Sequence, residues 1–496
     1  MAITVSAAAL SGVDAMSIEI EVDLLRKLPS VCIVGLAASA VKEAAERVRS
    51  AICSAGFDFP RMRVVVNLAP AHVRKEGTAF DLPIALGILA AAGVIPEEAL
   101  QRVLPAGELS LGGRLRPIRG ALSFAEVARA KGQSLLLPAE CAAHASMLPG
   151  AEVIGVTSLG EAVSWLRGEL EVLAARPSHP PRQDFGPDLA DVRGQASARR
   201  ALEIAAAGGH HLLLTGPPGC GKSMLAQRLP TILPPLTFHE ALETTRVHSA
   251  AGLFDQPSLI PHRPFRAPHH SVSVAGMVGS RDLRPGELGL AHNGVLFLDE
   301  APEFPRSVLE VLRQPLEDGV VRVTRAAGSV TWPAAITLVL AANPCPCGYR
   351  GSRRPCTCPD SSVDRYRRRL SGPILDRIDL QVTLQPVPAK MLLTEDEGES
   401  SAAVRERVCA ARSRQHARGQ GSPNSRLPAT SLMSQAELSS EALSALVSGA
   451  ESADLSSRSA SRVVRVARTI ADLDAAQRVA AHHVHEAFGL RVAGPA

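Results

Sequence analysis

The sequence predicts an α/β protein in three parts, with an N-terminal α/β domain, a central domain built as an α/β/α sandwich, and an all-helical C-terminal domain. Three observations predict this class. Strand-like and helix-like segments alternate up to about residue 170, a strand, a glycine-rich loop and a helix follow one another over 210–229, and helical periodicity dominates from Leu432 to Phe488. The expected boundaries are 1–172 for the first domain, 173–190 for a proline-rich linker, 191–390 for the central domain and 391–496 for the helical domain.

In the N-terminal domain, the spacing of apolar residues separates strands from helices. Strands are expected at 18–23, 31–36 and 62–70, the middle one as a fully buried run, and helices at 41–56 and 81–94. Because these segments alternate, this domain is expected to be an α/β unit of ordinary size.

The segment HHLLLTGPPGCGKSMLAQRL at 210–229 carries the pattern G-x-x-x-x-G-K-[ST]. Glycines let successive backbone N–H groups point at an anion, and the following helix adds the positive end of its dipole. Lys222 is expected to reach the β- and γ-phosphates of ATP, and Ser223 to bind Mg²⁺. The loop residues expected at the phosphates are Gly216, Pro217, Pro218, Gly219, Cys220 and Gly221. The alternative is a tight turn without a ligand.

Two further strands are expected to complete this site. GVLFLDE at 294–300 is a buried strand ending in two acids, of which Asp299 would hold the Mg²⁺ shell and Glu300 would polarise the attacking water. ITLVLAANP at 336–344 is a third strand, and Asn343 at its tip can orient that water.

Composition narrows the function only a little. The chain is 46% hydrophobic and 21% charged, as in ordinary globular proteins, and its net charge of +4 is too small to argue for nucleic acid. The 3% aromatic content argues against base stacking as a main binding device. With nine cysteines, no basic-then-apolar leader and no apolar run of spanning length, we expect a cytoplasmic protein without a membrane partner.

Residues 74–89 and 107–122 resemble the proteolytic domain of Lon-type proteases, which uses a Ser–Lys dyad. Here the serine position is Ala79, and the lysine region reads Ala121, Leu122 and Ser123. Since a dyad needs both a hydroxyl and a base that can lose its proton, the resemblance implies a Lon-like fold without peptidase activity. The domain is therefore expected to act as a scaffold or in assembly, with a cryptic protease as the alternative.

The order of motifs in the central domain resembles AAA+ ATPases, and more narrowly their magnesium-chelatase-like branch. The strings that carry this resemblance lie at 265–279, 284–300, 313–334 and 341–351. With the N-terminal domain and the CPCG segment, nearly all 496 residues resemble the ComM (YifB-like) family.

The resemblance implies roles for several residues. Gln195 lies by the adenine, Asn343 is the sensor-1 residue, and Arg458 fits the sensor-2 arginine of a helical lid. Arg377, between two acids, is either an arginine finger for a neighbouring subunit's γ-phosphate or a surface ion pair.

The resemblance also implies a function, a hexameric ATP-driven helicase that migrates DNA branches during natural transformation. Alternatives are a chelatase motor subunit that loads metal into a porphyrin, against which the N-terminal domain and the cysteine loop count, and an unfoldase without a peptidase. DNA contacts are expected from Arg322 and Arg325 on one face of a hairpin before the third strand, with a solvated face as the alternative.

Two other segments are candidates for contacts in a central pore or between subunits. His269 and His270 form a second pore-loop candidate, and seven arginines against two aspartates give residues 350–369 a local charge of +5. A phosphate-binding patch, a subunit interface and a solvated loop all explain that charge.

Four cysteines read C-x-C-x8-C-x-C, namely Cys345, Cys347, Cys356 and Cys358. Four thiolates can enclose a tetrahedral Zn²⁺, although the usual zinc spacing is C-x2-C. Inert loop thiols and a redox switch are the alternatives, and a structural Zn²⁺ is the hypothesis taken forward.

Overall fold

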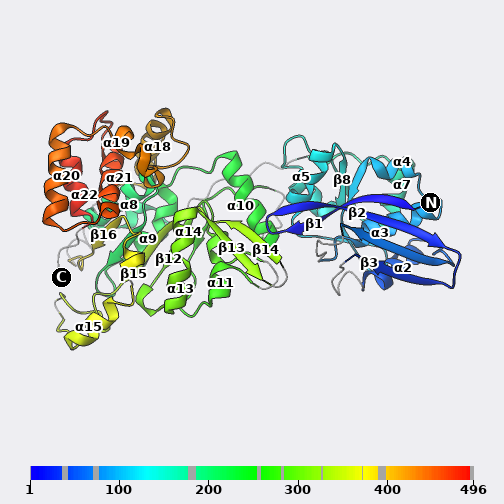
Figure 1. The fold of residues 1–496 in the computed structure, drawn as a ribbon, viewed down its shortest axis with the longest axis horizontal. Coiled ribbons are helices and arrows are strands. Elements are labelled where there is room, and N and C mark those ends of the chain that lie inside the picture. The colour runs from blue at the N-terminus through cyan, green and yellow to red at the C-terminus, as the bar shows by residue number, and fades with distance from the viewer. Residues whose placement is uncertain are drawn as a thin grey trace.

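The structure is a computed structural model of the chain. It describes residues 2–35, 43–70, 77–176, 186–253, 258–280, 284–325, 328–352, 354–370, 372–388 and 398–491. Figure 1 shows an elongated molecule in which the N-terminal domain, the central sheet domain and the C-terminal helices follow one another along the long axis. The α/β class and the helical C-terminal region are as predicted from the sequence.

The N-terminal domain is built on a four-stranded sheet in the order β1-β2-β4-β3. Its strands are β1 (Ile3–Ser11), β2 (Asp14–Leu25), β3 (Ser30–Val34) and β4 (Arg63–Ala69). Ile18, Ile20 and Val22 alternate with exposed residues, and this buried face packs against helix α3 (Asp81–Ala91). The expectation that the run at 31–36 is fully buried is wrong over 31–34, because β3 lies at the sheet edge and its residues are partly covered or exposed. Leu36 lies outside the described residues.

The remainder of this domain is a three-stranded parallel sheet in the order β5-β8-β9, a β6-β7 hairpin and flanking helices. The strands are β5 (Val103–Pro105), β6 (Glu108–Leu109), β7 (Leu115–Arg116), β8 (Ser134–Pro138) and β9 (Val153–Val156). The helices are α2 (Ala44–Ser54), α4 (Glu97–Gln101), α5 (Ala121–Lys131), α6 (Ala139–Ala145) and α7 (Leu159–Leu166).

At the positions of the Lon-type dyad, the side chains serve packing. Ser123 is buried in the first turn of α5, and its hydroxyl donates a hydrogen bond to the carbonyl of Val13. Ala79 carries only a methyl group, two residues before the buried Asp81, which forms an ion pair of 2.9 Å with Arg47. The Lon-like fold of this domain stays a prediction.

The central domain holds a five-stranded, fully parallel sheet in the order β11-β12-β15-β10-β16. Its strands are β10 (Leu212–Thr215), β11 (Phe265–Arg266), β12 (Val295–Leu298), β15 (Thr337–Ala342) and β16 (Leu380–Thr383). Leu212 and Leu214 face one core and Leu213 the other, so both faces of the sheet are covered, as parallel sheets require. The strands' carboxyl ends therefore meet at one edge.

The rest of the central domain consists of helices, short turns and one hairpin around this sheet (Figure 1). The helices are α8 (Ala196–Gly208), α9 (Lys222–Ile232), α10 (Phe238–Ala251), α11 (Val274–Val278), α12 (Glu287–Leu290), α13 (Arg306–Val311), α14 (Arg313–Asp318), α15 (Asp360–Arg367) and α16 (Gly372–Leu375). Short 3₁₀ turns are η1 (Leu189–Asp191) and η2 (Ala301–Glu303). The hairpin pairs β13 (Val320–Arg325) with β14 (Gly328–Pro333).

The C-terminal region is entirely helical in its described part, as predicted. It contains α18 (Ser401–Ala417), η3 (Asn424–Arg426), α19 (Ala429–Ala436), α20 (Ser440–Ser452), α21 (Ser457–Leu473) and α22 (Ala481–Gly489). In the ranges described above, no helix is both long enough and apolar enough to cross a bilayer.

A buried polar contact ties this helical region to the sheet. His210, just before β10, binds Asp379 through Nδ1 at 3.2 Å and Thr469 of α21 through Nε2 at 2.8 Å. Arg462 adds an ion pair of 2.6 Å to Asp379. Burial alone would raise the pKa of that carboxyl, but the hydrogen bond from His210 and the charge of Arg462 outweigh this effect and lower it.

The sequence of α22 predicts that His482, His483 and His485 all lie on the helix surface, and this prediction is wrong for His483. His483 is 1% exposed, because α22 packs against α21 along the side that carries it. Its Nδ1 accepts a hydrogen bond from the backbone of Ala480.

Candidate nucleotide-binding site

The glycine-rich loop joins β10 to α9 at the carboxyl edge of the central sheet. Gly221 has a φ of +95°, a left-handed conformation that disfavours other residues. A Cβ on Gly216 would lie 2.8 Å from the carbonyl oxygen of Leu384 and 2.9 Å from Sγ of Cys220, so this position also requires glycine. The strand, loop and helix predicted at 210–229 are all present.

Lys222 points back over this loop. Its Nζ donates to the carbonyl oxygens of Gly216 at 2.6 Å and Pro217 at 3.0 Å, and to Oδ1 of Asn343 at 3.1 Å. Burial lowers the pKa of Lys222, since desolvation disfavours its charged form. The ammonium of Lys222 thus contacts only uncharged oxygen atoms among the partners named here. A phosphate of ATP would give it a negatively charged partner.

The structure brings the two acidic candidates to the start of α9. The hydroxyl of Ser223 donates to Oδ2 of Asp299 at 2.7 Å, which is the pair of oxygens that would hold Mg²⁺. Glu300 follows with a φ of +52°, and its N–H donates to Oδ1 of Asp299 at 3.0 Å. The Glu300 side chain is exposed to solvent.

His270, a candidate for a pore loop on the sequence alone, lies next to Glu300. Its Nδ1 lies 3.9 Å from a carboxylate oxygen of Glu300, and its ring centroid lies 4.0 Å from that of His269, with the two rings tilted by 35°. Both histidines follow β11, which pairs with β12, and the parallel pairing brings them to the acids after β12. The pairing of β11 with β12 would have predicted that the two histidines lie near Glu300. The sequence does not reveal this pairing, because β11 is too short to show any periodicity.

Gln195 lies at the rim of the loop. Its Nε2 donates to the carbonyl oxygens of Cys220 at 3.1 Å and Gln385 at 2.7 Å. Gln195 therefore joins the phosphate loop to the segment after β16, and its place beside adenine stays a prediction.

Neither of the two candidate arginines binds the loop within the described ranges. The guanidinium of Arg377 is held against α14 by Glu317 at 2.8 Å and the carbonyl of Arg313 at 3.0 Å, and it is 14% exposed. Arg458 is an exposed residue in the first turn of α21. The structure thus brings together Lys222, Ser223, Asp299, Glu300 and Asn343, while the roles of Arg377 and Arg458 remain predictions.

The four cysteines form one cluster beside this site. The sulfur atoms of Cys345, Cys347, Cys356 and Cys358 all lie within 4.8 Å of one another. The backbone amide of Tyr349 donates to Cys347 and lowers the pKa of that thiol. The cluster follows Asn343 directly, and its loop touches the phosphate loop, because a Cβ on Gly348 would lie 2.7 Å from Cδ of Pro218.

The candidate DNA contacts lie on the β13-β14 hairpin. Val321, Val323 and Trp332 are buried in the core, whereas Arg322 is exposed on the other face and pairs with Asp318 at 3.2 Å. The predicted alternation is therefore present at Arg322. The side chain of Arg325 lies outside the described residues.

Comparison with known proteins finds three matching family models. They are described as magnesium chelatase subunit ChlI over residues 188–392, subunit ChlI of Mg-chelatase over 20–141, and the C-terminal part of magnesium chelatase subunit ChlI over 398–491. Because the N-terminal region also matches a ChlI model, that region no longer argues against a relationship to chelatases.

Full-length relatives have been found in several bacteria. The competence protein ComM of Haemophilus influenzae is 41% identical over 99% of this chain and 97% of its own length. The uncharacterised protein YifB of Escherichia coli is 41% identical over 97% and 95%, and an uncharacterised protein of Mycobacterium tuberculosis is 44% identical over 94% and 93%. Because its length is matched almost throughout, the chain belongs to the magnesium chelatase ChlI family, whose ATPase domain implies ATP hydrolysis, as a homologue of YifB and ComM.

Proposed function

We propose that the protein is an ATP-driven DNA motor, a branch-migration helicase that supports recombination of incoming DNA during natural transformation. It works as a ring of identical subunits, with six as the ring size that the family resemblance implies. Its cofactors follow from the ATPase domain, which implies ATP and Mg²⁺. Ser223 and Asp299 would hold the Mg²⁺ that neutralises phosphate charge in such sites.

One observation carries this proposal. Asn343, which binds Lys222 at 3.1 Å, directly follows strand β15, and only three residues separate the start of that strand from the end of the β13-β14 hairpin at Pro333. A change at the γ-phosphate beside Asn343 can therefore be transmitted along strand β15 to the hairpin. Arg322 on the exposed face of that hairpin offers a cation to a DNA phosphate.

Two other facts agree with a DNA partner. A full-length relative is named a competence protein. In the basic segment after β15, Arg350 pairs with Asp360 and Arg369 with Glu303, while Arg365 and Arg368 are exposed and form no ion pair with a residue that the structure describes.

An ATPase assay with DNA tests the proposal. We expect a Holliday-type junction or single-stranded DNA to raise the ATP turnover of the purified protein, and we expect the Lys222→Ala protein to show no turnover with or without DNA. Turnover that no polynucleotide changes, at low as well as physiological salt, would contradict a DNA motor.

Arg322 permits a matched comparison. In the Arg322→Ala protein, DNA should bind more weakly and the salt dependence of binding should fall by about one counterion, while turnover without DNA stays unchanged. Arg306 is the control, since it is an exposed arginine of the same domain with the same i,i+4 pairing, to Glu310 at 3.0 Å. Equal behaviour of the two variants would remove Arg322 from the DNA contact.

A chelatase-type motor is the second candidate, because all three family models are described as magnesium chelatase ChlI. Such a motor would hydrolyse ATP without a response to DNA and would bind the partner subunits that insert metal into a porphyrin. The same assay separates the two functions.

We also propose that the four cysteines hold a structural Zn²⁺. Sulfur ligands at about 2.3 Å from a tetrahedral zinc lie about 3.8 Å apart. The sulfur of Cys356 lies 3.6 Å from that of Cys345 and 3.5 Å from that of Cys347, and the N–H of Arg350 donates to Cys345 at 3.4 Å. The sulfur donors and the distances between them therefore suit zinc. A bound zinc would hold the loop that contains Gly348 against Pro218.

The zinc proposal predicts one zinc per chain. Protein purified without chelators should contain about one equivalent of zinc, and Cys356→Ser should lose it and unfold at a lower temperature. Cys53→Ser is the control, because Cys53 is an exposed thiol of α2 outside the cluster. Zinc far below one equivalent in the unaltered protein would contradict the proposal.

A further inference from the structure

A second cavity lies at the edge of the central sheet opposite the nucleotide-binding site. It has a volume of about 410 Å³ and is lined by residues just before three strands, namely Gly209, Asn293 and Ile336. The ATP-site residues follow the carboxyl ends of the same parallel strands. At 3.3 Å per residue, the two sites are separated by roughly 20 Å of sheet.

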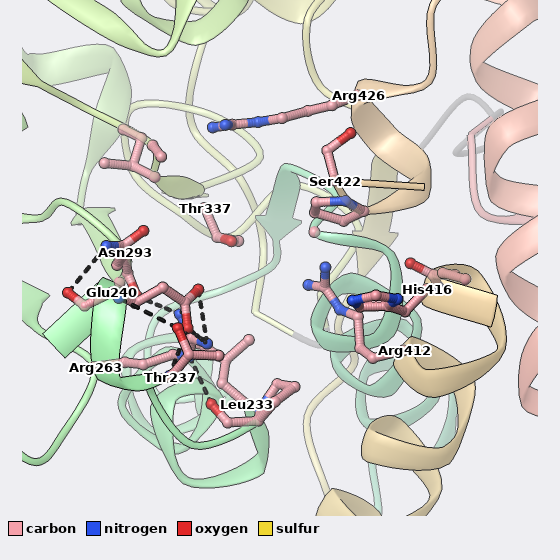
Figure 2. Close-up of a pocket in the computed structure, with 18 of the residues that line it drawn as sticks. Leu233, Thr237, Glu240, Arg263, Asn293, Thr337, Arg412, His416, Ser422 and Arg426 are labelled. Carbon is pink, nitrogen blue, oxygen red and sulfur yellow. Dashed lines mark hydrogen bonds and ion pairs between the residues drawn. The ribbon is translucent and has the colours of Figure 1, made fainter. Parts of the chain in front are cut away.

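The cavity lies between the sheet domain and the C-terminal helices. Figure 2 shows Arg263 and Glu240 on the sheet side, Arg412 and His416 of α18 on the opposite side, and Arg426 of η3 reaching across between them. Its other polar lining includes Thr337 and Ser422, and its apolar lining includes Leu233 and three prolines. The volume is within the range of sites for small molecules the size of a nucleotide.

The charges around this cavity do not balance. Three arginines line it, and Glu240 is the single carboxylate among its lining residues. Glu240 is already engaged, since it pairs with Arg263 at 3.1 Å and accepts a hydrogen bond from the N–H of Thr237 at 2.8 Å. Arg412 and Arg426 therefore lack a carboxylate of their own.

The hydrogen bonds of the two guanidinium groups support this conclusion. Within the described ranges, Arg412 donates only to the carbonyl oxygen of Ala206, at 2.9 Å from Nη2 and 3.3 Å from Nε. The guanidinium of Arg426 donates no hydrogen bond and forms no ion pair in that part of the chain. Both groups keep N–H donors directed at the cavity (Figure 2).

Electrostatics adds a physical reason for a ligand. Burial, with the neighbouring charge of Arg263, lowers the pKa of Arg412 to about 9, far from the usual value for arginine. Burial also lowers the pKa of Arg426. Such shifts mean that the cavity disfavours these cations, and a bound anion would offset the unfavourable energy.

We propose that this cavity is a binding site for a small phosphate-bearing molecule, whose oxyanions are held by Arg412 and Arg426. Planar guanidinium groups suit phosphate, because each can donate two parallel hydrogen bonds to it. The ligand would bridge η3 and α18 to the sheet domain and so hold the C-terminal helices against it. No step of the ATPase reaction is involved, so this site stands apart from the proposed DNA motor.

Calorimetric titration of the full-length Lys222→Ala protein with pyrophosphate tests this proposal, because that variant removes binding at the glycine-rich loop. We expect one saturable site per chain. Arg426→Ala and Arg412→Ala should each raise the dissociation constant about ten- to a hundredfold, as loss of a charge-assisted hydrogen bond does. Arg478→Ala should leave it unchanged, since Arg478 is an exposed arginine of the same helical region outside the cavity.

A second measurement guards against a folding defect. Wild-type protein should show two binding steps for pyrophosphate, of which Arg426→Ala removes one. In phosphate-free buffer, Arg426→Ala should unfold at a temperature no lower than that of wild type, because among the described residues this guanidinium has no hydrogen-bond or ion-pair partner and its charge is uncompensated. A structural role for Arg426 would lower the unfolding temperature with and without phosphate and would overturn the proposal.

Titrations with inorganic phosphate and with ADP identify which kind of phosphate compound the cavity binds. Tighter binding of inorganic phosphate than of ADP would assign a free phosphate, and the reverse would assign a nucleotide. Absence of saturable binding by all three probes would overturn the proposal, as would binding of an oligonucleotide alone.

Discussion

The Glu300→Gln protein is expected to bind ATP as tightly as wild type and to hydrolyse it at least about a hundredfold more slowly, because general bases contribute factors of this size. Glutamine keeps the size of the side chain, and the left-handed backbone at Glu300 is fixed by the N–H contact to Asp299 at 3.0 Å. The Ser223–Asp299 pair that would hold Mg²⁺ is untouched. The substitution therefore removes only the negative charge that is predicted to polarise the attacking water.

Glu303 provides the matched control for this variant. It lies three residues further along, at the end of η2, and forms a surface ion pair of 2.7 Å with Arg369. Since exposed pairs contribute about 0–1 kcal/mol, Glu303→Gln should keep near-normal turnover. Steady-state ATP hydrolysis and a nucleotide-binding titration measure both variants. A Glu300→Gln protein within about twofold of wild-type turnover would remove this residue from the role of base.

The sequence predicted which side chains come together at the glycine-rich loop, because these residues belong to a few contiguous motifs. Lys222 and Ser223 come from one loop, and Asp299, Glu300 and Asn343 each follow a strongly apolar strand. Parallel strands bring their carboxyl ends to one edge, so the contacts of Lys222 with Asn343 and of Ser223 with Asp299 follow from pattern alone.

Other features depend on the order of strands, which periodicity does not give. The apolar run at 31–36 has the composition of a buried strand, but β3 lies at an edge because only β4 pairs with it. His270 reaches Glu300 through a strand of two residues, β11, which carries no readable period.

The phosphate-binding cavity was out of reach of sequence reasoning for a related reason. Its arginines at 263, 412 and 426 come from a loop, a long helix and a short turn, with no common spacing. Arg412 and Arg426 are unremarkable on their own elements, and only the fold places both beside Arg263. An imbalance of charge is visible in the sequence only when its members are close together along the chain, as in the basic segment 350–369.

The Arg377→Ala protein is expected to bind ATP normally and to lose about a thousandfold or more in turnover, the range found for arginine fingers. In the isolated chain, Arg377 is held against α14 by Glu317 at 2.8 Å. That ion pair offers a control: if Arg377 serves only to bind Glu317, then Glu317→Gln should lose as much activity as Arg377→Ala. A finger predicts instead that Glu317→Gln stays active, because it frees the guanidinium to reach a neighbouring subunit.

Mixing two inactive proteins separates a finger in trans from a defect within one chain. Arg377→Ala subunits keep an intact Lys222, and Lys222→Ala subunits keep an intact Arg377. In rings formed from equal amounts, about a quarter of the interfaces combine an intact loop with an intact finger, so turnover should return in part. If no mixing ratio restores turnover while gel filtration shows mixed oligomers, Arg377 does not act across subunits, and the surface-pair interpretation stands.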